Sequence, residues 1–70
     1  AASELAARLT ARQRDVLRLL GEGEPNRAIA ERLGLAEGTV KLHIAAILRT
    51  LRVRNRTEAA LRARAAGLLD

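Results

Sequence analysis

Residues 37–51, with the sequence EGTVKLHIAAILRTL, decide the fold. At about 100° per residue, the branched aliphatic side chains of this stretch fall on one side of a helix. They are Val40, Ile44, Ile47 and Leu51, with Leu48 at the edge. The opposite side is made of small residues, hydrogen-bond donors and one leucine, namely Gly38, Leu42, Ala45 and Arg49, flanked by Thr39, Lys41 and Ala46. We therefore expect one face to pack on a core and the other to lie close against a partner.

A shorter helix is predicted just before this stretch, over residues 26–33. Pro25 suits a helix start because its φ is fixed near the helical value and it lacks an amide proton. Gly34 is expected to adopt the left-handed conformation that ends the helix. The inward-facing residues are Ile29, Ala30 and Leu33. Only residues 34–36 separate the two helices, which is the turn length of a helix-turn-helix.

A further helix is predicted on the N-terminal side, over residues 11–21. Thr10 and Gln13 have the spacing of a capping box, in which hydroxyl and amide satisfy free backbone donors. Gly21 and Gly23 are expected to end this helix by permitting backbone angles closed to other residues. Its core-facing residues are Val16, Leu17 and Leu20, with Gln13 on the same side.

The last predicted helix covers residues 56–66. Asn55 stands three residues ahead of Glu58, which is a favourable capping arrangement, and Gly67 suits the end of the helix. Its shallow apolar surface could serve the core, a second subunit or both, and comprises Ala59, Ala60, Leu61, Ala63 and Leu68. Residues 1–8 are interpreted as a linker or short helical lead-in, and residues 9–70 as the domain.

The composition favours one small all-α domain. With 70 residues there is room for a single core, and without any aromatic residue that core must consist of Leu, Ile, Val and Ala. The absence of cysteine excludes disulfides and thiolate ligands. No apolar run approaches the roughly 20 residues needed to span a bilayer, and the start of the chain lacks the features of a signal peptide. We expect a cytoplasmic protein that does not enter a membrane.

The net charge of +5 favours an anionic partner. From Lys41 to Arg64 the chain carries seven Lys or Arg and one acidic residue, Glu58, whereas the first half is nearly balanced. Charge alone would also fit an ordinary solvated basic surface. The position of the excess, which begins on residues 37–51, favours double-stranded DNA.

Two helices joined by so short a turn can bind DNA because the first braces the second, and a single helix fits the major groove. Lys41 could reach guanine acceptors or a phosphate, and Leu42 could meet a thymine methyl group. Phosphate contacts are expected from Thr39 at the helix start and from Arg49, two turns beyond Lys41. Asn26 and Arg27 could hold the DNA backbone from the preceding helix.

Three runs also match a known family: LTARQRDVLRLL, GEPNRAIAERLGL and TVKLHIAAILRTLRVRNRTEA. Together they closely resemble the LuxR-type helix-turn-helix domain, the DNA-binding module of many bacterial transcription regulators. The resemblance covers about residues 9–68. Its most specific parts are Thr39, Val40, Lys41, His43, Ile47, Leu48, Leu51 and Val53 with residues 55–59.

The resemblance implies a four-helix domain whose third helix enters the major groove, with Lys41, Leu42 and Ala45 facing bases. The family often has a polar residue at the position of Ala45, so alanine limits hydrogen bonding there. The fourth helix commonly mediates dimerisation, which would place Ala60, Leu61 and Arg64 at a homodimer interface. The module is usually attached to a receiver or ligand-sensing domain, and RNA polymerase is a further candidate partner. No cofactor and no catalysis are expected.

The chain departs from the family pattern at several helix ends. Pro25 stands where the family usually has Ser or Thr, and Ala28 where it often has Glu, so the capping box of the second helix is missing. Ala36 replaces a typical serine cap before residues 37–51. Gln13 replaces a common glutamate, and Arg52 stands where glycine is frequent. A lost cap typically costs about 1 kcal/mol.

Several side chains admit a second interpretation. His43 is expected to be half-buried or to face a phosphate, because no second histidine or nucleophile accompanies it. Arg54 and Arg56 are assigned to phosphates, although solvation of this cluster, with Arg52, is an equal alternative. For the whole chain, the alternatives are region four of a sigma factor and a basic helical module that binds an acidic protein.

Overall fold

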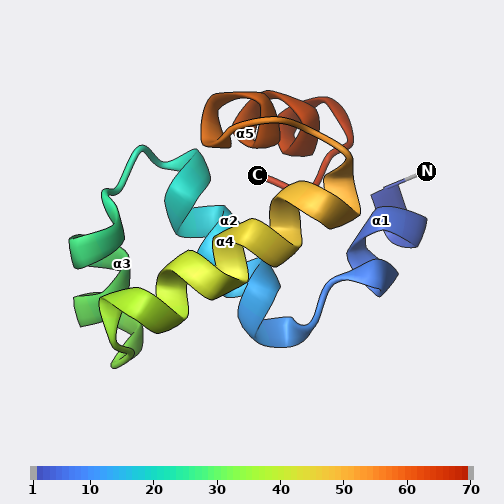
Figure 1. Cartoon of the computed structure of the whole chain (residues 1–70). Helices are drawn as coiled ribbons and strands as arrows, with labels where there is room; N and C mark the ends of the chain where they lie inside the picture. Colours follow the sequence, from blue (N-terminus) through green and yellow to red (C-terminus); the bar gives the residue numbers. More distant parts are fainter. Residues whose placement is uncertain (1, 70) are drawn as a thin grey trace.

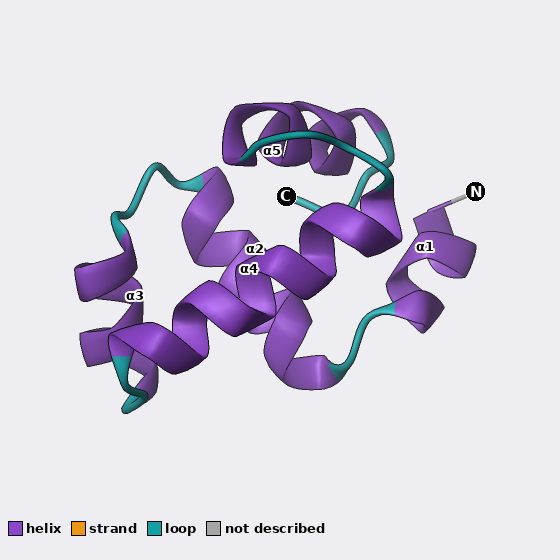
Figure 2. Ribbon diagram, viewed as in Figure 1, coloured by secondary structure: helices purple, strands orange, loops and turns teal. Residues whose placement is uncertain are grey.

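The structure, a computed structural model, describes residues 2–69, and the side chains of residues 4–69. Five helices follow one another, and the described residues contain no strand. They are α1 (Ala2–Arg8), α2 (Ala11–Gly21), α3 (Asn26–Leu33), α4 (Glu37–Leu51) and α5 (Arg56–Ala65) (Figures 1 and 2). The predicted all-α fold is confirmed, and only the last helix ends one residue earlier than predicted. Ala2–Arg8 is helical, and the division of the chain at residue 8 stays a prediction.

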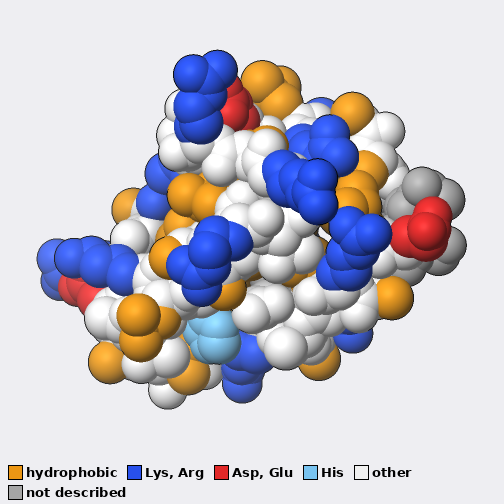
Figure 3. Space-filling model, turned by 45° about the vertical axis from the view of Figure 1, so that its right-hand side comes forward, with side chains coloured by type: hydrophobic (Ala, Val, Ile, Leu, Met, Phe, Trp, Pro, Cys, Tyr) orange, Lys and Arg blue, Asp and Glu red, His pale blue; other side chains and the backbone are white. Residues whose placement is uncertain are grey.

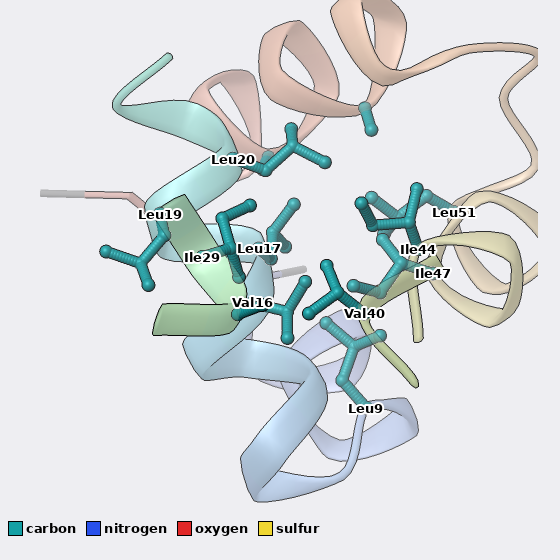
Figure 4. Close-up of a cluster of buried hydrophobic side chains, with 13 residues drawn as sticks. Leu9, Val16, Leu17, Leu19, Leu20, Ile29, Val40, Ile44, Ile47 and Leu51 are labelled. Atoms are coloured by element: carbon teal, nitrogen blue, oxygen red, sulfur yellow. The ribbon is translucent and has the colours of Figure 1, made fainter. Parts of the chain in front are cut away.

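Helix α4 is the central element of the packing and contacts all four other helices. Figure 1 shows it crossing in front of α2, with α5 above it. Its predicted apolar stripe is confirmed, because Val40, Ile44, Ile47 and Leu51 are buried and Leu48 packs partly buried against them. In Figure 4 the side chains of Val40, Ile44, Ile47 and Leu51 point toward the buried side chains of α2. The buried stripe fixes which face of α4 remains available outside.

The core also includes residues that the helical pattern did not indicate. Leu9, in the connection between α1 and α2, is buried, and Leu19 of α2 is buried beside the predicted stripe. Leu5 of α1 packs against this core. Arg14 fastens the same region, because its Nη1 donates to the carbonyl oxygens of Ala6 and Leu9, each at 2.8 Å. Helix α1 is therefore attached to the domain by both apolar packing and hydrogen bonds.

The helix starts differ in how they are capped. The capping box of α2 is confirmed, with Thr10 N donating to Gln13 Oε1 at 3.0 Å and Gln13 N donating to Thr10 Oγ1 at 3.1 Å. At α5, the Glu58 amide donates to Asn55 Oδ1 at 2.9 Å. Pro25 and Ala36 precede α3 and α4 without any side-chain cap. Among α2 to α5, the two helices of the helix-turn-helix are thus the two that lack capping side chains at their starts.

Two helix ends show why particular residues stand there. Arg52 ends α4 in the left-handed region, with φ 58 and ψ 48, where the family often has glycine. The interpretation of Gly21 as a residue with an unusual backbone angle is wrong, because it is the last helical residue of α2 and only Gly23 has a positive φ there. Gly21 instead makes room for Leu69, whose Cδ1 would lie 2.5 Å from an added Cβ. Close approach of the C-terminal segment therefore explains this glycine.

Candidate nucleic-acid interface

Helices α3 and α4 form the predicted helix-turn-helix. Gly34 adopts the left-handed conformation, with φ 67 and ψ 36, and the Leu35 amide donates to the Ala30 carbonyl oxygen at 2.9 Å. Leu33 and Leu35 pack against the core on either side of this turn. The short turn and its two leucines fix α3 against α4, so the outer face of α4 has a defined direction.

The outer face of α4 is exposed and contains few bulky residues. Lys41, Leu42 and Arg49 are exposed, and the exposed fraction of Leu42 reaches 73%. Ala45, between them, and Thr39, at the start of the helix, are partly exposed. A helix with its side chains is about 10–12 Å wide and the major groove is about 12 Å wide, so a slim face is needed for close approach. The predicted base-facing residues thus share one accessible surface.

Within residues 4–69, the positive charges on α4 have no carboxylate partners. Arg12 and Arg18 pair with Asp15, and Arg32 pairs with Glu22 and Glu24. Among the described residues, no ion pair engages the cations on or directly after α4, which are Lys41, Arg49 and Arg52. In Figure 3, Lys and Arg side chains spread over the face in view, and Asp and Glu side chains lie near its margins. The surface around α4 therefore favours an anion.

Two predicted phosphate contacts take part in weak ion pairs. Arg27 Nε lies 3.9 Å from Glu31 Oε2, and Arg54 Nε lies 3.9 Å from Glu58 Oε2. The Arg54 side chain is 91% exposed. Solvated pairs of this length contribute little stability and are screened by salt. Both arginines can therefore exchange their carboxylate for a phosphate at small cost.

The structure brings together two residues that were predicted separately as phosphate contacts. Arg56 Nη1 donates to Asn26 Oδ1 at 2.6 Å, and Arg56 Nη2 donates to the Glu24 carbonyl oxygen at 2.9 Å. These bonds connect the start of α5 with the first residue of α3. Sequence analysis missed the contact because 30 residues separate the pair and neither helix pattern requires it.

The residues predicted for a dimer interface lie in different environments. Leu61 is 63% exposed, whereas Ala60 packs partly buried against the core. Arg64 Nη2 donates to the Gly21 carbonyl oxygen at 3.1 Å and so holds α5 on α2. An open groove of about 560 Å³ runs beside Leu61, with Leu5 and Val53 among its apolar lining residues. Of the three residues, Leu61 offers the largest free apolar surface.

Nothing in residues 2–69 suggests a metal centre or a membrane segment. His43 is partly buried on α4, and no three His, Cys, Asp or Glu residues of the described part stand close enough to hold a metal ion. No helix in the same range has the length and apolar character needed to cross a bilayer. The interpretation of His43 as a half-buried residue agrees with this burial.

A braced helix with an exposed, slim and cationic outer face defines a helix-turn-helix domain of the DNA-binding kind. Comparison with known proteins specifies this class further. A family model described as "Bacterial regulatory proteins, luxR family" (GerE) matches residues 7–63. The chain belongs to this family and is the helix-turn-helix DNA-binding domain of a transcription regulator.

Individual relatives agree with this assignment. The nitrate/nitrite response regulator protein NarL of Escherichia coli (strain K12) is 45% identical over 53 residues, which are 76% of this chain and 24% of that protein. The glycerol metabolism activator of Pseudomonas putida is 50% identical over 62 residues, or 89% of this chain and 28% of that protein. The chain thus spans about a quarter of the length of these curated relatives.

A solved structure also has the same fold. The structure of the transcription factor GerE is similar with a TM-score of 0.81 and 32% identity, covering 89% of this chain and 92% of that one. The luxR family consists of transcription regulators and not of enzymes. This confirms the prediction that the domain catalyses no reaction. Membership of the luxR family also favours a DNA-binding regulator over the two alternatives, which were region four of a sigma factor and a basic module that binds an acidic protein.

Proposed function

We propose that this domain binds double-stranded DNA sequence-specifically by inserting α4 into the major groove. The observation that carries this proposal is the outer face of α4, where Lys41, Leu42 and Arg49 are exposed and the two cations lack ion-pair partners among the described residues. At 1.5 Å per residue, Lys41 and Arg49 stand about 12 Å apart along the helix axis. One helix can therefore contact bases near its start and the DNA backbone near its end.

The proposed contacts divide into two kinds. Lys41, Leu42 and Ala45 face base edges, where Lys41 donates to guanine and the two apolar residues meet thymine methyl groups. Phosphates are bound by Thr39 and Arg49 on α4, by Asn26 and Arg27 on α3, and by Arg54 beside α5. Because Lys41 is the only strong donor among the base-facing residues, few bases are read directly. DNA shape and phosphate contacts supply the remaining selectivity.

We propose further that two copies bind paired half-sites through α5. The exposed Leu61 and the apolar groove that it lines support this arrangement, because covering this combined apolar surface with a second copy removes it from water. Ala60 and Arg64 would lie at the edge of such a contact. In the whole regulator, an attached receiver or ligand-sensing domain would control the dimer, and RNA polymerase would be a partner in the cytoplasm.

Selection of bound fragments from a random duplex pool tests the proposal. A selected sequence motif with two related half-sites at a fixed spacing is expected, and the spacing gives the dimer geometry. The affinity for the selected duplex should fall with salt, with a slope of about 0.9 for each neutralised phosphate. A pool that yields no preferred sequence, even at low salt, would contradict sequence-specific binding.

A further inference from the structure

The start of α5 holds the start of α3 through a single side chain. The Arg56 guanidinium makes two hydrogen bonds, from Nη1 to Asn26 Oδ1 at 2.6 Å and from Nη2 to the Glu24 carbonyl oxygen at 2.9 Å. Both bonds are partly buried. A planar guanidinium fixed at two points has a defined direction, and it fixes the side chain that accepts from it.

The chemistry of this contact orients the Asn26 amide. A guanidinium has only donors, so Asn26 must turn its carbonyl oxygen toward Arg56. The NH₂ group of Asn26 then points away from Arg56. No acceptor for this group occurs among the described residues. None of their fully buried side-chain polar atoms lacks a hydrogen-bond partner, so Nδ2 is not fully buried and has contact with solvent. The bond from Arg56 therefore leaves the two N–H donors of the Asn26 amide free, at the first residue of α3.

The surrounding charges favour an acceptor that is an anion. Arg56 has no ion pair among the described residues, because Glu24 offers it only the backbone carbonyl and binds Arg32 with its carboxylate at 3.0 Å. The guanidinium charge thus stays uncompensated beside the Asn26 amide. It also lies at the positive end of the α3 dipole, where a cation is unfavourable for the helix. This placement is costly for stability and useful for binding a phosphate.

We propose that Arg56 is a positioning residue for DNA binding, which orients the Asn26 amide so that it donates to a DNA phosphate. This inference rests on the proposed function and changes the part played by Arg56. Arg56 acts through Asn26 rather than by its own phosphate contact, whereas Arg54, which points into solvent, contacts DNA directly. The bond between α5 and α3 thereby couples the position of the dimerisation helix to one anchor of the helix-turn-helix.

Four variants on the selected duplex test this role: Asn26→Ala, Arg56→Lys, their double mutant, and Asn26→Asp. Asn26→Ala should lower the affinity about tenfold or more, which is the effect of losing a hydrogen bond to a charged group. Arg56→Lys keeps the charge but cannot make the two-point contact, so its loss should match that of Asn26→Ala. The double mutant should bind as Asn26→Ala does, because the two residues act as one unit.

Two results would overturn the proposal. Arg56→Lys binding like the wild type would mean that the charge alone matters. A double mutant whose loss is the product of the single losses would mean that Arg56 contacts DNA independently of Asn26. Arg18→Lys is the matched control, because Arg18 lies on α2, outside the residues proposed to contact DNA, and pairs with Asp15 at 3.8 Å. This variant should keep nearly wild-type affinity.

If Arg56→Lys does not fold, Asn26→Asp still tests the proposal. Aspartate retains an acceptor for Arg56 and so preserves the link between α5 and α3, but it removes the donors and repels a phosphate. It should melt no lower than the wild type and bind more weakly than Asn26→Ala, and wild-type affinity of this variant would contradict the inference. Absence of selective binding by the wild-type chain itself would instead count against the proposed function.

Discussion

Arg52 ends α4 in a conformation that costs free energy. Its φ of 58 and ψ of 48 lie in the left-handed region, and among the described residues it is the only non-glycine residue with a positive φ. The Val53 amide, which follows Arg52, donates to the Leu48 carbonyl oxygen at 3.0 Å, so the left-handed conformation of Arg52 is needed to close the last turn. Replacing Arg52 by glycine should therefore stabilise the domain while preserving the turn.

The size of this gain follows from two opposing effects. An L-residue in the left-handed conformation costs roughly 1–2 kcal/mol, which glycine avoids. Glycine also makes the unfolded chain more flexible, and this costs about 0.4–1 kcal/mol. The net stabilisation should be about 0.5–1 kcal/mol. For a domain of this size, the melting temperature should rise by roughly 2–8 °C.

Thermal and urea unfolding followed by circular dichroism measure the effect. The urea midpoint should rise without a change in m-value, because the folded surface is unaltered. Arg52→Ala is the matched control, since it removes the charge and side chain but keeps the strained backbone. If Arg52→Gly were no more stable than Arg52→Ala, backbone strain at the end of α4 would not be the cause.

Three other predictions concern the caps, the core and the dimer surface. Ala36→Ser should stabilise the domain by about 1 kcal/mol in urea unfolding, because Ala36 has the backbone angles of a helix cap but no capping side chain; an unchanged midpoint would contradict this. Ile47→Ala should destabilise by about 2–5 kcal/mol because Ile47 is fully buried, whereas Leu42→Ala, on the exposed face of α4, should change stability by no more than about 0.5 kcal/mol. Equal losses in these two variants would mean that the faces of α4 are wrongly assigned. In a gel-shift titration, Leu61→Glu should abolish cooperative binding to paired half-sites, because it puts a charge into the proposed dimer contact, and should leave binding to a single half-site unchanged. Retained cooperativity would show that α5 does not form the dimer interface.

Much of the fold could be predicted because its signals are local. The stripe of α4, the Thr10 capping box and the left-handed Gly34 each depend on residues within one or two turns of the same helix. The faces of a helix follow directly from the spacing of its apolar residues, which is why the exposed position of Lys41 and Leu42 was also predictable.

The parts that could not be predicted depend on contacts between distant segments. The role of Gly21 depends on Leu69, which approaches it only after α5 has folded back on α2. The contact between Arg56 and Asn26 crosses 30 residues, and no periodic pattern carries it. The sequence therefore predicts both residues as DNA contacts but carries no sign that one of them holds the other.

The central claim is that α4 recognises base sequence in the major groove, and Lys41→Ala tests it most directly. Its affinity should be compared with that of the wild type on the selected duplex and on an unrelated duplex at the same salt concentration. Loss of a base contact should cost about 1–3 kcal/mol on the selected duplex and much less on the unrelated one. Arg27→Ala should weaken binding to both duplexes similarly, as expected of a phosphate contact. Equal losses for Lys41→Ala on both duplexes would contradict the claim that this face of α4 recognises sequence.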